Sequence, residues 1–196
     1  MSTPAPILKS PFDERRVRAL RAGEAVRLDG VVYTGRDRLH AFLHGGGEPP
    51  VPLRDAALFH CGPVVVPEGA GWRVVAAGPT TSSREDPYMP DIIARCGVRV
   101  ILGKGGMGAN TREACRVHGC VYLQVVGGAA ASLARRITAV RRVFFLEEFG
   151  ATEAMWELAV EGLDAVVGMD AHGASLFDRV RRDSEARLRT LLAGNR

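Results

Sequence analysis

A loop rich in hydroxyl groups is the part of the chain with the clearest residue types for chemistry. Residues 78–84 read Gly-Pro-Thr-Thr-Ser-Ser-Arg and follow an apolar stretch at 72–77. Arg84 offers paired N–H donors that match a carboxylate, and the hydroxyl groups of Thr80 and Thr81 suit hydrogen bonding or proton transfer. The same residue types are also common in a turn followed by a helix N-cap. The loop therefore predicts a carboxylate site, with plain helix capping as the alternative.

A glycine-rich loop at 103–108, Gly-Lys-Gly-Gly-Met-Gly, is the second candidate. It matches Gly-x-Gly-x-x-Gly between an expected strand and an expected helix, a pattern typical of dinucleotide binding. However, the next strand ends in Gln-Val-Val-Gly at 124–127, without an acid to hold a ribose. Lys104 is one of only two lysines, with Lys9, among 26 basic residues. Its compact ammonium beside backbone N–H groups predicts an anion-binding corner rather than a nucleotide site.

A third junction between a strand and a helix lies at 33–40, Tyr-Thr-Gly-Arg-Asp-Arg-Leu-His. Arg36 and Asp37 could join a site here, and the alternative is helix capping by Asp37 with a surface His40. The chain has no Ser/His/Asp order, no His-Glu-x-x-His motif and no Walker loop. It supplies anion clamps and hydroxyl groups without a strong catalyst, which indicates half of an active site.

Short alternating elements must position these three segments. Residues 17–77 are expected to be rich in β-structure, and residues 78–178 to alternate strands with helices. Expected strands lie at 25–34, 57–66, 72–77, 99–102, 121–126, 143–147 and 165–169. A turn signal at Asp29-Gly30 interrupts the first of them, and the segment at 152–159 is ambiguous. Expected helices lie at 13–22, 35–44, 88–95, 110–118, 129–137 and after 173, with Asn110 and Glu113 suited to capping one of them. Gly97 and Gly119 are expected to end the helices at 88–95 and 110–118. This alternation predicts an α/β fold with a mainly parallel sheet, whose strand carboxyl ends carry the ligand site.

Composition argues against several classes of protein. The net charge of +4 comes without a basic stripe interleaved with aromatic residues, so nucleic acid is not the expected partner. No apolar run approaches the roughly 20 residues of a membrane span, and residues 1–11 lack a secretory pattern. A cytoplasmic protein without a membrane span is therefore expected. Residues 1–12 should form an irregular arm, and Arg-rich residues 179–196 a helical tail that is solvated or docks an acidic partner.

The cysteines do not form a strong metal-binding pattern. Cys115 and Cys120 flank His118, but no Cys-x-x-Cys pair is present. Packed apolar thiols are the better interpretation, also for Cys61 and Cys96, so the chain is expected to ligate no metal.

Five segments occur in the order found in one enzyme family and span most of residues 17–178. They are residues 33–37, 77–84, 103–108, 121–131 and 166–177. The pair Gly-Pro-Thr-Thr-x-x-Arg and Gly-Lys-Gly-Gly-Met-Gly is specific, whereas either motif alone is not. With these motifs the chain resembles the β subunit, or the C-terminal domain, of class I fumarases and L(+)-tartrate dehydratases, which are iron–sulfur hydro-lyases.

The resemblance implies a swivelling β/β/α domain over residues 13–178 and a two-part enzyme. In that family a partner α subunit or N-terminal domain holds a 4Fe-4S cluster through three cysteines, and the active site lies between the two parts. An open iron of the cluster acts there as a Lewis acid. This chain is expected to need its α partner, in an α2β2 assembly, for activity.

The resemblance also assigns roles to the charged and hydroxyl groups. Thr80 would transfer the proton at the carbon beside a substrate carboxylate, with Lys104 as its charged neighbour. Arg36, Arg84 and Lys104 would bind the substrate carboxylates and stabilise the charge that develops on them.

Two further residues complete the implied site. Thr81 would line the substrate position, and both Thr81 and Asp37 would orient the groups that touch the substrate. The departures from the family's pattern are mild. Ser82 and Ser83 stand where small residues such as Ala-Gly are common, and Arg38 is unusual beside the Arg-Asp pair. Either departure could tune which diacid fits.

The implied reaction is the reversible hydration of fumarate to (S)-malate, a step of the tricarboxylic acid cycle catalysed by a carbon–oxygen lyase. The same chemistry on L(+)-tartrate or mesaconate is the close alternative, because partner residues would share the choice of substrate. Two rivals belong to other classes. A non-catalytic anion-binding module would hold a ligand at Arg84 and Lys104 without turnover, and a nucleotide-dependent oxidoreductase would bind NAD.

Overall fold

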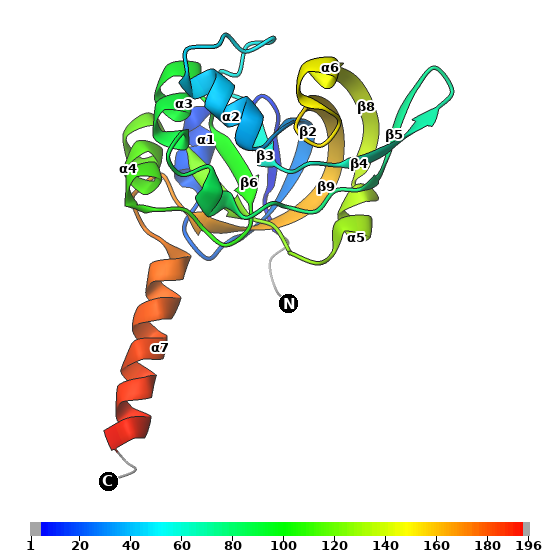
Figure 1. Ribbon diagram of the computed structural model, residues 1–196. Coiled ribbons are helices and arrows are strands. Elements are labelled where there is room, and N and C mark those ends of the chain that lie inside the picture. Colours follow the sequence, from blue (N-terminus) through cyan, green and yellow to red (C-terminus); the bar gives the residue numbers. More distant parts are fainter. Residues whose placement is uncertain (1–4, 194–196) are drawn as a thin grey trace.

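Seven strands form the main sheet of the computed structural model, which describes residues 5–193 (Figure 1). They are β1 Ile7–Lys9, β2 Ala25–Gly35, β3 Ala57–His60, β6 Val100–Gly103, β7 Val121–Gln124, β8 Ile137–Phe144 and β9 Met155–Met169, in the sheet order β1-β2-β3-β6-β7-β9-β8. Neighbours from β1 to β7 are parallel, whereas β9 is antiparallel to β7 and β8. This mixed, mostly parallel sheet with flanking helices confirms the predicted α/β class.

Strand β9 closes part of the sheet into a ring, because it also pairs with β2. Alternate residues of the parallel strands point to opposite sides, as the pleat requires. On one side, Phe59, Leu102 and Leu123 join an apolar cluster with residues of β2 and β9. On the other side, Leu58, Ile101 and Tyr122 join a cluster with residues of the helices. Burial on both sides explains why β3, β6 and β7 appear in the sequence as short apolar runs.

Helices flank the sheet as expected for the α/β class, except that the last helix extends away from it. They are α1 Glu14–Ala19, α2 Asp37–His44, α3 Met89–Cys96, α4 Ala109–His118, α5 Ala130–Ala134, α6 Leu146–Phe149 and α7 Leu176–Ala193. Figure 1 shows α2, α3 and α4 together on one side of the domain, and α3 packs on both of the others. The left-handed residues Gly97 and Gly119 end α3 and α4, as predicted for these two helices.

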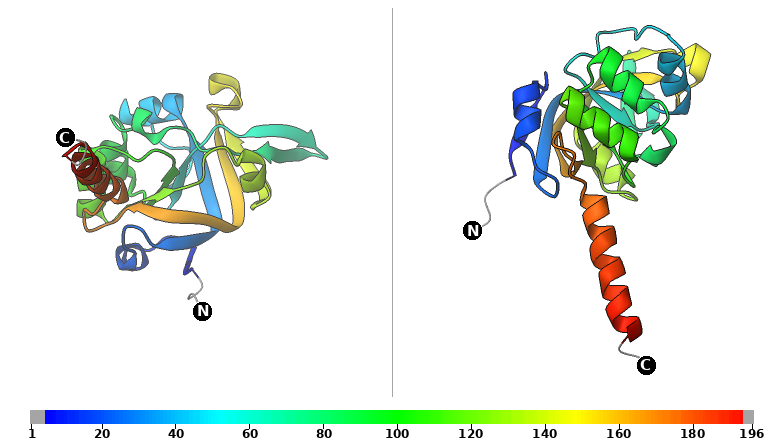
Figure 2. Two further views of the ribbon diagram at one scale, coloured as in Figure 1. Left: turned by 90° about the horizontal axis from the view of Figure 1, so that it is seen from below. Right: turned by 90° about the vertical axis from the view of Figure 1, so that its left-hand side faces the viewer.

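The predicted strand at 57–66 is interrupted. Strand β3 ends at His60, and Gly62-Pro63 separates it from β4, Val64–Glu68. Because Pro63 has no backbone N–H, regular strand pairing stops there. Strand β4 pairs with β5, Gly71–Ala76, in an antiparallel hairpin that projects from the body of the domain (Figures 1 and 2).

The last strands also differ from the prediction. The helix expected at 129–137 is shortened to α5, and β8 begins at Ile137. The ambiguous segment at 152–159 and the strand expected at 165–169 are parts of one strand, β9. Charged pairs such as Arg142 and Glu157, 2.6 Å apart across β8 and β9, interrupt the apolar pattern that would have indicated these strands.

The N-terminal segment is more regular than expected. Strand β1 pairs in parallel with residues 27–29 of β2, although an irregular arm was expected at 1–12. Residues 1–4 of that arm lie outside the described residues. Gly30 was expected to interrupt its strand, but β2 continues through a bulge there, where Gly30 has a φ of 112°.

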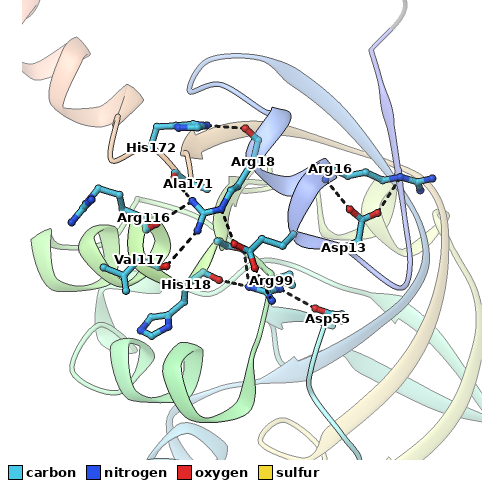
Figure 3. Close-up of polar contacts among 12 residues, drawn as sticks. Asp13, Arg16, Arg18, Asp55, Arg99, Arg116, Val117, His118, Ala171 and His172 are labelled. Atoms are coloured by element: carbon cyan, nitrogen blue, oxygen red, sulfur yellow. Dashed lines mark hydrogen bonds and ion pairs between the residues drawn. The ribbon is translucent and has the colours of Figure 1, made fainter.

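Arginine side chains attach α1 to the rest of the domain (Figure 3). Arg18 Nη1 donates to the carbonyl oxygens of Arg116, at 3.1 Å, and of Ala171, at 3.0 Å. Arg99 Nη2 pairs with Glu14 of α1 at 3.1 Å, and Arg99 also donates to the carbonyl oxygen of His118. Cations are favoured beside the C-terminal carbonyl groups of a helix, here α4. These contacts hold α1 at the end of α4 that leads into the start of β7.

Helix α7 extends away from the body of the domain (Figures 1 and 2). It begins at Leu176, contains no buried residue and exposes Val180, Leu188, Leu191 and Leu192. The expected helical tail at 179–196 is therefore helical up to Ala193, and residues 194–196 lie outside the described residues. Among helices in the described part of the chain, none is both long enough and apolar enough to cross a membrane.

Candidate active site at the strand ends

Three neighbouring parallel strands end at the same edge of the sheet. Strands β2, β3 and β6 end at Gly35, His60 and Gly103, and they are adjacent in the sheet order. Arg36 follows the first of these strands, and Lys104 follows the third. Ligand sites of α/β proteins lie at such carboxyl ends.

The hydroxyl loop reaches this edge by its own backbone pairing. The Thr80 N–H donates to the carbonyl oxygen of His60 at 2.7 Å, and the Ser82 N–H donates to that of Lys104 at 3.0 Å. Thr81 and Lys104 form a parallel bridge. The loop therefore lies between the ends of β3 and β6. It reaches this place without β5 entering the main sheet, whereas the strand before the loop was expected to belong to that sheet.

A cluster of charged side chains and one hydroxyl group forms above these strand ends. Arg84 Nη2 donates to Asp37 Oδ2 at 2.7 Å and to Thr80 Oγ1 at 3.3 Å. Arg36 Nη2 lies 3.9 Å from the same Asp37 oxygen, and Arg36 Nε lies 3.5 Å from Glu153 Oε1. The Arg84 side chain is 45% exposed, so its remaining N–H groups are open to a ligand. The cluster can bind a carboxylate and hold a hydroxyl group beside it.

Gly62 was not singled out from the sequence, yet it limits the position of Arg36. A Cβ atom on Gly62 would lie 2.9 Å from Arg36 Cδ and 2.5 Å from the carbonyl oxygen of Thr152. Only glycine leaves room for both neighbours. The signal in the sequence is the Gly-Pro pair that ends β3.

The backbone of Lys104 pairs with that of Thr81 at the edge of the sheet. Its side chain adds a positive charge. Its Cδ atom lies beside Gly127, 3.4 Å from where a Cβ atom of that residue would be. Across residues 5–193, none of the ion pairs involves the Lys104 ammonium. An ammonium without an acid partner at the strand ends is suited to bind an anion.

The backbone of the glycine loop differs from the predicted anion-binding corner. The Gly105 N–H donates to Gln124 Oε1 at 3.1 Å, and the Gly106 N–H donates to Tyr122 Oη at 3.3 Å. Side chains of the protein therefore occupy these amides, and the prediction that they would bind an anion is wrong. Lys104 remains as the part of this loop with an available charge.

The N-terminus of α4 is occupied as well. Asp86 Oδ1 accepts from the Gly108 N–H at 2.8 Å and from Thr111 Oγ1 at 2.6 Å. A carboxylate of the protein thus lies where a dinucleotide site would place a phosphate. The capping role predicted for Glu113 is also wrong, because this side chain pairs with Arg116.

A buried polar layer lies beneath the charged cluster, and the sequence did not predict it. His40, His60 and Glu85 are completely buried. His40 Nδ1 donates to the carbonyl oxygen of Arg36 at 2.7 Å, and the same nitrogen lies 3.5 Å from the Glu85 carboxyl group. The rings of His40 and His60 meet edge to face at 4.9 Å. The expectation of a surface His40 is wrong, because this residue shares the apolar face of α2 with its neighbour Leu39.

Burial determines the protonation of this layer. It lowers the pKa of His40 to about 4 and that of His60 well below its ordinary value, so both rings are neutral near pH 7. Burial, reinforced by the negative charge of Asp37 and opposed by Arg84, raises the pKa of Glu85 to about 7. The layer thus contains a carboxyl group that titrates near neutral pH.

The cysteines do not fit an iron–sulfur cluster, which is held by several Cys thiolates. Cys61, Cys115 and Cys120 are buried, and Cys96 is half-buried. Burial raises the pKa of Cys61 to about 12 and that of Cys120 well above its ordinary value. Within the described ranges, no three His, Cys, Asp or Glu side chains are grouped to hold a metal ion.

Fold and site together define an α/β domain that gathers guanidinium, ammonium and hydroxyl groups at one edge of its sheet. The family described as Fumarase C-terminus matches residues 7–180, and the chain belongs to this family. The resemblance found in the motifs is therefore confirmed.

Individual relatives carry the names of hydro-lyases. "Putative fumarate hydratase class I" of Geobacillus stearothermophilus is 47% identical over 92% of this chain and 35% of its own length. "Putative L(+)-tartrate dehydratase subunit beta" of Methanocaldococcus jannaschii is 34% identical over 91% of this chain and 94% of its own length. The "L(+)-tartrate dehydratase subunit beta" of Escherichia coli K12 is 33% identical over 87% of this chain and 86% of its own length. The chain thus spans about a third of the first relative and most of the two beta subunits.

Proposed function

We propose that this chain is the β component of a two-part hydro-lyase that reversibly hydrates fumarate to (S)-malate. The observation that carries the proposal is the meeting of Thr80, Asp37 and Arg84, in which the Arg84 guanidinium contacts both other side chains. Arg36 and Lys104 bring further positive charge to the same strand ends. Such a set can bind a small dianion and hold a hydroxyl group against it.

Thr80 is the proposed proton-transfer group. In its alkoxide form, Oγ1 takes the proton from the carbon beside a substrate carboxylate, and in hydration the hydroxyl group returns that proton. A threonine needs help to ionise, and the Arg84 guanidinium, 3.3 Å from Oγ1, stabilises the negative oxygen. Asp37 accepts from the same guanidinium and so fixes its direction.

The substrate carboxylates are proposed to lie against Arg36, Arg84 and Lys104. Asp37 and Glu153 already offset the charge of the two arginines. Lys104 makes the set net positive, because its ammonium has no acid partner in the described part of the chain. We assign Lys104 to the carboxylate whose charge grows as the neighbouring C–H bond breaks.

A partner α subunit or domain is proposed to supply the rest of the site in an α2β2 assembly. Relatives named subunit beta support a two-component enzyme, and a longer relative is compatible with both parts in one chain. When bound in that partner, a 4Fe-4S cluster would supply Lewis-acid chemistry. The buried thiols of this chain support the assignment of the cluster to the partner.

L(+)-Tartrate is the second candidate substrate. The relatives with this name resemble the present chain in length, since it covers 94% and 86% of them. The same groups would serve, because tartrate is also a four-carbon dicarboxylate that loses water beside a carboxylate. Mesaconate, with an extra methyl group, requires only more room in the site.

The test is anaerobic reconstitution of this chain with its α partner, iron and sulfide. We expect hydration of fumarate, followed by its ultraviolet absorbance, only when both chains are present. A complex that turns over tartrate or mesaconate but not fumarate would reassign the substrate. A cluster-loaded complex that is inert toward all three would contradict the proposal and favour a non-catalytic anion-binding module.

A further inference from the structure

Glu85 is a carboxyl group without a hydrogen-bond donor. Its side chain is completely buried, and within residues 5–193 neither carboxyl oxygen has a hydrogen-bond partner. His40 Nδ1 lies 3.5 Å from Glu85 Oε2, but its N–H already donates to the carbonyl oxygen of Arg36 at 2.7 Å. Burial of an ionised carboxylate without donors is costly, so this environment favours the protonated acid.

Among the described residues, the unpaired ring nitrogens of the same buried layer give Glu85 no hydrogen bond. Nε2 of His40 and Nε2 of His60 are buried and have no partner in the described part of the chain. His40 uses its Nδ1 hydrogen as a donor, so its Nε2 carries a free lone pair. No hydrogen bond joins either nitrogen to Glu85, so neither stabilises an ionised carboxylate.

The charge of Glu85 acts directly on the proposed substrate site. The groups around Glu85 are Arg36, Asp37 and His40 from α2 and its N-cap, Arg84 from its own turn, and Glu153 from the segment before β9. The ring of His60, from β3, lies next to the ring of His40. With Glu85 neutral, the positive charges of Arg36 and Arg84 are balanced by the two carboxylates that they contact, Asp37 and Glu153. Ionisation of Glu85 adds one buried negative charge that competes with a bound dianion for the guanidinium groups.

We propose that Glu85 is a positioning residue of the dicarboxylate site: in its protonated form it leaves Arg36 and Arg84 available for the substrate carboxylates. Loss of this proton weakens binding of the dianion. This inference rests on the proposed function. Its pH range follows from burial, which raises the pKa of Glu85 to about 7.

The first test requires no variant and uses the full chain. The side-chain carboxyl carbon of Glu85 is followed by NMR in isotope-labelled protein from about pH 4 to about pH 9. We expect a midpoint near 7 for Glu85. A Glu85 midpoint in the ordinary range would overturn the proposal.

The second test measures binding of succinate, an unreactive dicarboxylate, to the reconstituted complex by calorimetry. Between about pH 6.5 and about pH 8.5 we expect the wild-type affinity to fall several-fold, toward about tenfold. Glu85→Gln, which keeps the shape and removes the proton, should hold its affinity across this range. Glu161→Gln is the matched control and should behave as wild type.

The outcomes separate the two proposals. Succinate binding that declines with pH equally in wild type and Glu85→Gln would overturn the role of Glu85 alone. A folded complex that binds no dicarboxylate at any pH would overturn the proposed function, and the role of Glu85 with it. Near-ultraviolet circular dichroism checks that the variant is folded, and the wild-type NMR titration decides the protonation independently.

Discussion

The guanidinium of Arg84 connects the residues on which the proposed chemistry depends. It donates to Asp37 and to Thr80 and remains 45% exposed. Replacement by alanine removes charge-assisted hydrogen bonds of about 1.5–3 kcal/mol each. In the reconstituted complex, Arg84→Ala should lower kcat/KM by about 10- to 100-fold or more. The exposed Arg15 on α1 is the control, because Arg15→Ala removes equal charge far from the strand ends.

Glu85 predicts a distinct pH dependence of stability. The folded chain keeps this proton up to about pH 7, whereas the ordinary pKa in an unfolded chain is 4.5. The folded state thus binds this proton more tightly between these values, and the contribution of Glu85 to stability falls as the pH rises through this window. The free energy of unfolding of Glu85→Gln, relative to wild type, should therefore increase from pH 4.5 to 7, by on the order of 1–3 kcal/mol.

Denaturant unfolding at several pH values measures this difference. For the variant His40→Gln we expect the opposite pH dependence of the free energy of unfolding. Burial lowers the pKa of His40 from 6.5 to about 4. In that range the unfolded chain binds a proton that the folded chain does not, so the contribution of His40 to stability falls as the pH falls. The free energy of unfolding of His40→Gln, relative to wild type, should accordingly increase toward low pH. A flat difference curve for Glu85→Gln would show that Glu85 is ionised in the folded protein.

Single residues of the site were predictable where a motif carries them. Arg36, Arg84 and Lys104 stand in segments whose order and spacing are specific, so the sequence singles them out. Glu153 and His60 come from other elements and have no motif. They join the site only because β3 and the segment before β9 meet the other strand ends, and a tertiary contact of this kind has no local signal.

At the scale of elements, the start of α4 shows how a helix is capped from outside. Asp86 accepts from Gly108 N–H and Thr111 Oγ1, while Glu113 forms an exposed pair with Arg116. Asp86→Ala should therefore lower the free energy of unfolding by about 1–2 kcal/mol. Glu113→Ala should change it by less than about 0.5 kcal/mol. Equal losses in thermal or denaturant unfolding would show that the sequence-based capping box operates after all.

A helix or strand was predictable from the sequence when its pattern of apolar and polar residues is set by its own short segment. Strands β3, β6 and β7 are buried on both sides and are short apolar runs between glycines and helices. Strand β9 is 15 residues long and changes its neighbours along its length, from β8 to β7. Its exposed and charged positions reflect those neighbours, so only its final apolar part was recognised.

At the scale of the whole molecule, the packing of the ring of strands and of the helices around it involves α7 very little. No residue of α7 is buried, but Phe177 near its start packs on Gly106 and meets the Tyr122 ring at 6.0 Å. Deletion of residues 181–196 should change the melting temperature by less than about 2 °C, measured by circular dichroism. Phe177→Ala, as the contrasting variant, should cost about 1–3 kcal/mol. A large loss on deletion would reveal a structural role of the distal helix.

The most direct measurement of the proposed chemistry is the turnover of Thr80 variants in the reconstituted complex. Thr80→Val keeps the shape of the side chain and removes its hydroxyl group, while Thr80→Ser keeps the hydroxyl group. Proton transfer by Thr80 predicts that Thr80→Val lowers kcat by about 100-fold or more with little change in KM, and that Thr80→Ser retains substantial activity. A folded Thr80→Val complex with kcat within about threefold of wild type would contradict this role.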